Sequence, residues 1–144
     1  MRAVVQRVSR AAVRVDGATV GEIGEGLLVL LGVARGDGPE QAVRTAAQIA
    51  KLRIFDDDEG RFARSVLDTG GAVLAVSQFT VLAGTAKGNR PSFSDAAPGP
   101  EAEPVYEAFC AALAGAGLRV ERGVFGARME VELVNAGPVT IVLD

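Results

Sequence analysis

The chain has 144 residues, 49% of them hydrophobic and 23% charged, with a formal net charge of −3, which is the composition of one ordinary globular domain spanning residues 1–144. It contains no histidine and no tryptophan, and Cys110 is its only cysteine. These absences exclude a Ser-His-Asp triad, a Cys-His dyad, histidine metal sites, thiolate metal clusters and an internal disulfide, so an enzyme of this composition must move protons through carboxylates, backbone groups, water or its substrate.

The first third of the chain predicts strands followed by a helix. Strands are expected at residues 1–8 and 12–15, with a type I′ turn at Asp16-Gly17 leading into a return strand at 18–23. The continuous apolar run of residues 26–33 is typical of a strand that is buried on both faces. A helix opens at Asp37-Gly38-Pro39-Glu40. Its apolar positions at helical spacing are Val43, Ala47, Ala50 and Ile54.

The acidic run at residues 56–59 predicts a turn. It does not match a calcium-binding EF-hand loop, because Gly60 occupies the position of the fifth ligand. No metal and no organic cofactor is predicted. The longest strongly apolar run, residues 27–31, is too short to cross a bilayer, and arginines interrupt any signal-peptide core in the first fifteen residues, so we expect a cytoplasmic protein.

The rest of the chain predicts a second strand, a second helix and further strands. A hydrophobic strand is expected over residues 71–82, followed by a polar loop at 84–91 and a proline-rich stretch at 98–104. A helix follows and ends near Gly115 and Gly117; Cys110 lies beside its apolar stripe as a small buried hydrophobe. That stripe contains Val105, Phe109, Ala112 and Leu113. Alternation over residues 128–133 and 139–143 predicts two strands separated by a break. The sequence therefore predicts a single α+β domain with mostly antiparallel or mixed sheets and two main helices.

Basic residues are concentrated in two segments. Residues 85–93 contain Lys87 and Arg90 without an acid. Residues 1–15 contain four arginines and no acid: Arg2, Arg7, Arg10 and Arg14. This distribution fits a basic, nucleic-acid-binding face on an acidic protein, but charge alone favours scattered, solvated arginines.

Two polar stretches stand at the ends of predicted strands. Ser77-Gln78-Phe79-Thr80 closes the second hydrophobic strand, where it either presents hydroxyl and N–H groups to a ligand or only satisfies neighbouring backbone. Asn135-Ala136-Gly137-Pro138-Val139-Thr140 interrupts the last strand, where Gly-Pro is either a plain turn or a functional segment. The local pattern leaves both alternatives open.

Four segments in order along the chain carry a family resemblance: residues 1–8 (MRAVVQRV), 24–33 (GEGLLVLLGV), 77–81 (SQFTV) and 135–140 (NAGPVT). Together they resemble the D-aminoacyl-tRNA deacylase family over essentially the whole chain. The Ser-Gln-Phe-Thr and Gly-Pro-Val-Thr segments are specific as a pair. Two positions depart from the family pattern, with Val81 in place of the frequent leucine and Ala136 in place of a frequent acid.

The resemblance implies a homodimer of three-layer β/β/α subunits with two active sites at the dimer interface. It implies that the Gly137-Pro138 bond is cis and that this motif enters the partner's pocket, where it faces residues 77–80. Arg7 matches a position that helps to hold the motif, and Phe125 and Met129 are expected to line the pocket.

The activity implied by the resemblance is hydrolysis of the ester that joins an amino acid to the terminal ribose of tRNA. The expected substrates are D-aminoacyl-tRNA and glycyl-tRNA, including glycine mischarged on the tRNA for alanine. Phosphates of the acceptor end would contact the basic N-terminal segment together with Lys87 and Arg90. A Thr80 nucleophile would lack an activating base, so we expect the tRNA 2′-hydroxyl to assist hydrolysis while N–H groups near Phe79 and Thr80 stabilise the oxyanion.

Selection against L-amino acids is expected to be steric. A rigid Gly-cisPro backbone beside the substrate α-carbon would collide with an L side chain, whereas D side chains and glycine would fit. Two alternatives remain at this point: an enzyme of the same fold that edits L-alanyl-tRNA and has a trans Gly-Pro bond, and a dimer that binds tRNA without cleaving it.

Overall fold

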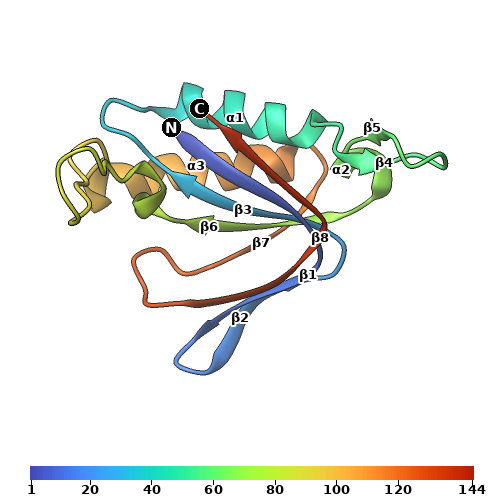
Figure 1. The fold of residues 1–144 in the computed structure, drawn as a ribbon, viewed down its shortest axis with the longest axis horizontal. Helices are drawn as coiled ribbons and strands as arrows, with labels where there is room; N and C mark the ends of the chain where they lie inside the picture. The colour runs from blue at the N-terminus through green and yellow to red at the C-terminus, as the bar shows by residue number, and fades with distance from the viewer.

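A computed structural model describes all residues from Met1 to Asp144. Its centre is one six-stranded mixed sheet (Figure 1). The strand order is β2-β1-β3-β6-β7, with β8 paired along the other edge of β1. The β3–β6 and β6–β7 pairs are parallel, and every pair made by β1 is antiparallel. The strands of this sheet are β1 (Arg2–Val15), β2 (Ala18–Ile23), β3 (Gly26–Gly32), β6 (Ala72–Ser77), β7 (Arg119–Arg122) and β8 (Glu130–Leu143).

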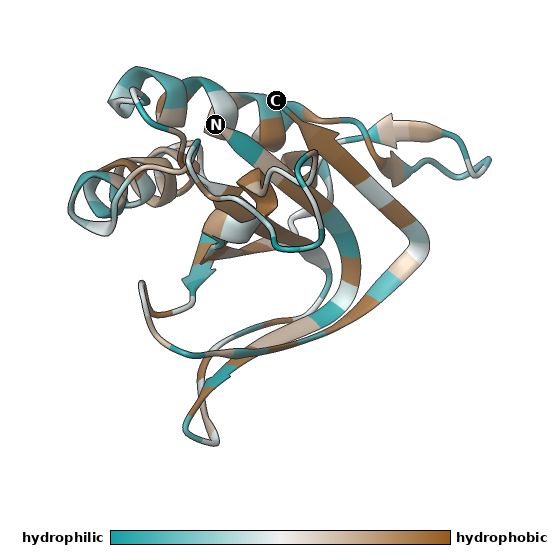
Figure 2. Ribbon diagram, turned by 60° about the vertical axis from the view of Figure 1, so that its left-hand side comes forward, coloured by the Kyte–Doolittle hydropathy of each residue, from teal (hydrophilic) through white to brown (hydrophobic).

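The central strands are buried on both faces, which confirms the expected three-layer β/β/α arrangement. Leu27 and Leu31 of β3 pack into a cluster under the helices α1 (Pro39–Lys51) and α3 (Gly99–Gly115), whereas Leu28 packs into a second cluster on the opposite face. The outer halves of β1 and β8, together with β2, fold across that second face (Figure 1). Figure 2 shows apolar residues along the strands, with hydrophilic residues on the outer helix turns and loops.

β1 and β8 are each one long strand where two separate strands were predicted. Val5 faces the helix-side cluster, whereas Val8 and Val13 face the other, so the side-chain alternation changes parity once along β1. The β1–β8 register shifts on either side of Val8 allow this change. The break predicted at Gly137-Pro138 is therefore a local irregularity inside β8. Because the far edge of β8 pairs with no strand, a proline without an N–H is tolerated there.

The buried face of α1 differs from the predicted stripe. Val43 is 52% exposed, Ala47 is exposed, and Ile54 lies beyond the end of the helix. The buried positions are Ala42, Ala46, Ile49 and Ala50. The prediction is confirmed at Ala50 and was wrong by one residue at Val43 and Ala47, because it favoured the bulkier Val43 over Ala42, whereas the close packing of α1 on the sheet and on α3 selects alanine.

Helix α3 begins at Gly99, well before the end of the proline-rich stretch that was expected to precede it. Pro104 lies in its second turn and removes only the one hydrogen bond that its N–H would have donated to the carbonyl of Pro100. The predicted stripe is confirmed at Val105, Phe109 and Leu113, and Cys110 is buried as expected.

Several short elements were not predicted from the sequence. The strand predicted over residues 71–82 ends at Ser77 and continues as a 3-10 turn, η1 (Phe79–Leu82), while β7 and the hairpin of β4 (Phe55–Asp56) and β5 (Phe62–Arg64) were not predicted. The one-turn helix α2 (Val66–Thr69) was also missed, although the Ser65-x-x-Asp68 capping box announces it: Asp68 N–H donates to Ser65 Oγ at 3.1 Å and Ser65 N–H to Asp68 Oδ2 at 2.8 Å.

Candidate active site

A cavity of about 410 Å³ opens beside the C-terminal end of β6. Five of the residues singled out from the sequence line it: Ser77, Gln78, Phe79, Phe125 and Met129. They come from the end of β6, from η1 and from the segment between β7 and β8, so the fold joins stretches about 50 residues apart in the chain. The other lining residues are small or aliphatic and carry no chemical pattern by which the sequence could reveal them. They are Val33, Ala97, Gly99, Ala102, Gly126, Ala127 and Val131.

The turn after β6 leaves two backbone donors unused. Gln78 N–H donates to Leu31 O at 2.8 Å, and Val81 N–H donates to Gln78 O at 3.3 Å, which fixes the start and the end of the turn. Phe79 and Thr80 are the first two residues of the 3-10 turn, so their N–H groups have no acceptor inside it, and none of the loop or side-chain hydrogen bonds uses them. Two adjacent free donors at the cavity edge form the kind of site that accepts a developing negative charge.

The Thr80 side chain is exposed and does not line the cavity. Its hydroxyl accepts a hydrogen bond from the Gln78 side-chain amide. This contact orients the hydroxyl but cannot take its proton, because a primary amide is not a base at neutral pH. Thr80 therefore lacks the activating partner that a nucleophilic hydroxyl needs.

The cavity wall formed by Phe125 rests on Tyr106 of α3. The two ring centroids lie 5.9 Å apart with an interplanar angle of 42°. Tyr106 is 1% exposed, and its hydroxyl donates to Ala75 O at 2.8 Å. Burial raises the pKa of Tyr106, so this hydroxyl stays a donor throughout the physiological range. Neither Tyr106 nor its contact with Ala75 was predicted, because a buried tyrosine in a helix stripe has no distinguishing pattern.

The Gly137-Pro138 segment lies elsewhere on the chain, on β8 beside Arg7. Its peptide bond is cis, and both residues are exposed. The Arg7 guanidinium donates to Ala136 O at 3.1 Å and to Ile54 O at 2.9 Å, and pairs with Asp56 at 3.3 Å. The structure thus brings Arg7 to the Gly-Pro segment and separates both from the cavity of the same chain.

The Asn135 side chain supports this segment from inside β8. Its amide donates to Arg7 O at 2.9 Å and to Val139 O at 3.0 Å, which spans the Gly-Pro irregularity. Neither Gly137 nor Pro138 is among the residues that line the cavity. The segment therefore does not reach the cavity of its own chain.

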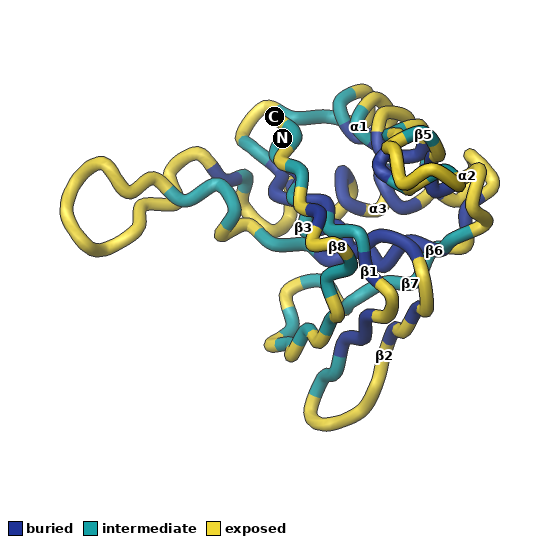
Figure 3. The backbone as a smooth tube through the Cα atoms, turned by 45° about the vertical axis from the view of Figure 1, so that its right-hand side comes forward, coloured by how far each residue is buried: buried dark blue, intermediate teal, exposed yellow.

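Lys87 and Arg90 lie on an exposed loop that projects from the body of the molecule (Figure 3). The loop is closed at its base by the Gly84–Ser92 pair, with N···O distances of 2.7 and 2.8 Å. It is tied to the site by Phe93, whose ring packs edge-on against that of Phe79 at 5.0 Å. Neither Lys87 nor Arg90 is paired with an acid.

The arginines of the N-terminal segment do not form a free basic face. Arg2 pairs with Asp144, Arg7 with Asp56, and Arg10 and Arg14 both with Glu132. Hydrogen bonding from Arg10 lowers the pKa of Glu132, which keeps its carboxylate charged. The antiparallel β1–β8 ladder brings Glu132 beside Arg10 and Arg14, so these pairs offset part of the positive charge of the segment, and its binding of phosphate stays a prediction.

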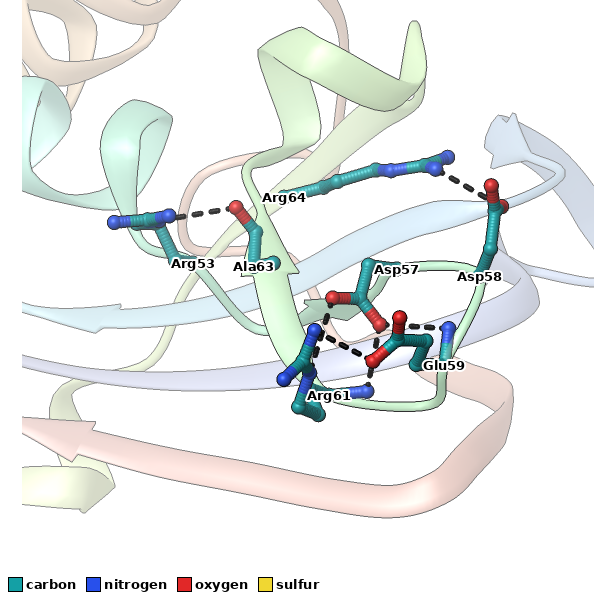
Figure 4. Close-up of polar contacts among 7 residues, drawn as sticks. All are labelled: Arg53, Asp57, Asp58, Glu59, Arg61, Ala63 and Arg64. Atoms are coloured by element: carbon teal, nitrogen blue, oxygen red, sulfur yellow. Dashed lines mark hydrogen bonds and ion pairs between the residues drawn. The ribbon is translucent and has the colours of Figure 1, made fainter.

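Three acids of the run, Asp57, Asp58 and Glu59, bond within their own hairpin (Figure 4), whereas Asp56 pairs with Arg7. Asp57 accepts from the N–H groups of Glu59 and Arg61 at 2.9 and 3.0 Å, and backbone bonding from Arg61 lowers its pKa. Arg61 and Arg64 pair with the remaining carboxylates, at 2.7 Å to Glu59 and 3.1 Å to Asp58. This cluster shapes the turn between β4 and β5, as the sequence predicted.

The fold and the cavity define a class of protein: three-layer α+β domains with a Ser-Gln-Phe-Thr turn at a cavity edge and a Gly-Pro segment on the last strand. No helix is long and apolar enough to cross a membrane. The family model described as D-Tyr-tRNA(Tyr) deacylase matches residues 4–144. The chain belongs to this family.

Relatives cover the chain from end to end. A protein of Anaeromyxobacter dehalogenans named D-aminoacyl-tRNA deacylase is 63% identical over 144 residues, covering 100% of this chain and 97% of the relative. A protein of the same name from Deinococcus radiodurans is 59% identical, covering 100% and 99%.

Two solved structures have the same fold. One, described as c-Myc DNA Unwinding Element Binding Protein, is 42% identical, covers 100% of this chain and 98% of its own, and has a TM-score of 0.93. A second, described as a probable eukaryotic D-amino acid tRNA deacylase, is 17% identical, covers 99% and 97%, and has a TM-score of 0.84, which shows the likeness of fold.

Proposed function

We propose that this protein is a D-aminoacyl-tRNA deacylase, a carboxylic ester hydrolase that frees tRNA from D-amino acids and from glycine. Water adds across the ester, the acyl C–O bond breaks, and the products are the amino acid and a tRNA with a free terminal ribose hydroxyl. The observation that carries the proposal is the meeting of Ser77, Gln78 and Phe79 with Phe125 and Met129 on one cavity, in a chain that belongs to the family described above. Aminoacyl-tRNA as substrate implies action in the cytoplasm.

The chemistry relies on positioning and on backbone donors. The free N–H groups of Phe79 and Thr80 stabilise the oxyanion, at about 3 kcal/mol for a well-placed donor. The chain has no histidine, and the Thr80 hydroxyl contacts only an amide. The proton that the attacking water loses is therefore passed to the leaving ribose oxygen by the substrate itself. The ribose 2′-hydroxyl adjoins the ester at very high effective concentration and assists the attack of water. No metal or organic cofactor takes part in this scheme.

Selection against L-amino acids comes from the Gly137-Pro138 segment of a second copy of the chain. The segment is exposed, is fixed by Arg7 and Asn135, and does not line the cavity of its own chain. The outer edge of β8 pairs with no strand and is free to meet a second copy. In the resulting homodimer each segment enters the partner's cavity, and its main chain collides with an L side chain but leaves room for a D side chain or for glycine.

The acceptor end of the tRNA is held at the loop that carries Lys87 and Arg90. Both cations are exposed and lack acidic partners, and the Phe79–Phe93 contact fixes the loop beside the cavity. Two phosphate contacts give a modest salt dependence of binding.

A second candidate function is nucleic-acid binding without ester cleavage. The 42% identical solved structure is named for DNA binding, and the same exposed loop would serve that role. A third is editing of L-alanyl-tRNA by the same fold. All three make different predictions for purified protein and charged tRNA.

The deciding experiment compares D-tyrosyl-tRNA with L-tyrosyl-tRNA, with L-alanyl-tRNA and glycyl-tRNA as further substrates. We expect rapid release of D-tyrosine and glycine, and no release of L-amino acids at enzyme concentrations that clear the D form. Binding of tRNA without cleavage would favour the second function, and preferential cleavage of L-alanyl-tRNA the third; either result would overturn the proposal.

A further inference from the structure

Gly123 directly follows β7 and lies behind Met129, a residue of the cavity wall. Its N–H donates to Ala75 O at 3.2 Å, which extends the β6–β7 ladder by one bond. Its φ angle lies in the region open to all residues, since it is not among the positive-φ glycines. The requirement for glycine here therefore comes from space and not from backbone conformation.

The side chain of Met129 fills the space that a larger residue at position 123 would need. A Cβ atom on Gly123 would lie 2.7 Å from Met129 Sδ, closer than two such atoms can approach. Its next neighbours, at 3.7 Å, are methyl groups of Val13 and Val76, both 0% exposed. Met129 is thus seated directly on the glycine, with buried valines beside it.

Met129 lines the cavity, and Gly123 does not. The thioether therefore lies between the glycine and the cavity. A methyl group at position 123 would push it away from the glycine, and the closely packed valines leave the cavity as the open direction. The adjoining wall cannot move aside to compensate, because Phe125 is backed by the buried Tyr106, which is anchored to Ala75.

We propose that Gly123 is a positioning residue that sets the depth of the cavity by seating Met129. The inference rests on the proposed function, in that substrate must enter this cavity. Because the end of a methionine side chain is flexible, its displacement costs the fold little, whereas a shallower cavity weakens substrate binding. The effect of a methyl group at position 123 is therefore on activity and not on stability.

The test is a double-mutant cycle with Gly123→Ala and Met129→Ala, measured on D-tyrosyl-tRNA hydrolysis. Gly123→Ala is expected to lower kcat/KM by about ten- to a hundredfold, mainly through KM, because a misplacement of about 1 Å costs up to about a hundredfold. Met129→Ala removes the group that collides, so adding Gly123→Ala to it is expected to cause no further loss. Gly24→Ala is the matched control, since Gly24 has an ordinary φ and a Cβ atom there would meet no atom within 4 Å.

A second readout does not depend on activity. The chain has two methionines, Met1 and Met129, so the methyl resonances of protein labelled at methionine are assigned by loss of one signal in Met129→Ala. Gly123→Ala is expected to shift the Met129 resonance, leave that of Met1 in place, and change Tm by less than about 4 °C. An inactive parent protein would refute the proposed function while this spectrum still tests the seating of Met129.

Three results would overturn the inference. The first is parental activity in Gly123→Ala, and the second is an unmoved Met129 resonance. The third is a double variant whose loss of kcat/KM, expressed as a free energy, equals the sum of the losses in the two single variants.

Discussion

At the scale of single residues, Thr80 shows how neighbours limit what a side chain can do. From the sequence, the Thr80 hydroxyl at the end of a strand could be a nucleophile. In the structure its partner is the Gln78 side-chain amide, which donates a hydrogen bond to it. The backbone N–H of the same residue is free, and its side chain is exposed. The chemical value of Thr80 under the proposed mechanism therefore lies in its main chain.

Replacing Thr80 by alanine tests this assignment. We expect Thr80→Ala to keep kcat within about a hundredfold of the parent, because the backbone donor and the substrate hydroxyl remain. The measurement is single-turnover hydrolysis of D-tyrosyl-tRNA, with the exposed Thr19→Ala on β2 as a control. A fall of about a millionfold, as for loss of a covalent nucleophile, would refute substrate assistance.

At the scale of elements, the structure corrects which side of α1 is buried. Ile49 is 0% exposed within the helix-side cluster, whereas Val43 is 52% exposed on the outer face. Two aliphatic residues of one helix therefore contribute very differently to its docking.

Alanine substitutions quantify this difference. Ile49→Ala is expected to lower the free energy of unfolding by about 2–5 kcal/mol through lost burial and a residual cavity. Val43→Ala is expected to leave it within about 0.5 kcal/mol, since the exposed valine gives way to a better helix former. Urea unfolding at one fixed protein concentration measures both, and similar values for the two variants would contradict the orientation of α1.

The extent to which elements could be predicted follows the strength of their patterns. The continuous apolar run of β3 and the Asp16-Gly17 turn, with φ of 50° and 79°, were predicted because burial on two faces and positive φ each restrict residue choice. β7 was missed because Arg119–Arg122 is short and charged. The continuity of β1 was missed as well. Where this strand crosses from one layer to the other, the alternation of buried and exposed side chains shifts by one residue, and in a sequence such a shift resembles the end of a strand.

The same contrast holds for the candidate site. The stretch of residues 77–80 was singled out by its polar residues at a strand end, whereas Tyr106 behind Phe125 and Gly123 behind Met129 have no local signal in the sequence. Cavity walls made of alanine, glycine and valine resemble core in a sequence. The pairing of Arg10 and Arg14 with Glu132 was not predicted, because it depends on the β1–β8 register, which joins the two ends of the chain.

At the scale of the whole molecule, the proposed dimer divides each active site between two chains. The cavity of one chain would be completed by the Gly-Pro segment of the other. A variant defective in its cavity and a variant defective in its segment should then complement each other, because one of the two sites in a mixed dimer is intact.

A tandem-tag experiment tests this division. Ala127→Trp fills the cavity, and Gly137→Ala disturbs the segment. The Ala127→Trp homodimer is expected to be inactive on D-tyrosyl-tRNA. The Gly137→Ala homodimer is expected to be inactive as well, or to lose its discrimination against L-tyrosyl-tRNA. The mixed dimer, isolated through two different tags, is expected to recover about half of the parental stereoselective activity. A mixed dimer no better than its parents would show that each chain supplies its whole site.

Gly137 also bears on how this sequence can change over evolutionary time. Two independent conditions hold the position: its φ of 119°, and Arg7 Nη2 standing 2.7 Å from where a Cβ would lie. A mutation that shortens residue 7 would remove the contact with Arg7 but would leave both the positive φ angle and Val139 Cγ2, which stands 3.0 Å from the same Cβ position. Sequence drift is therefore blocked at this position, while Gly24, with open space around it, can be replaced in a single step.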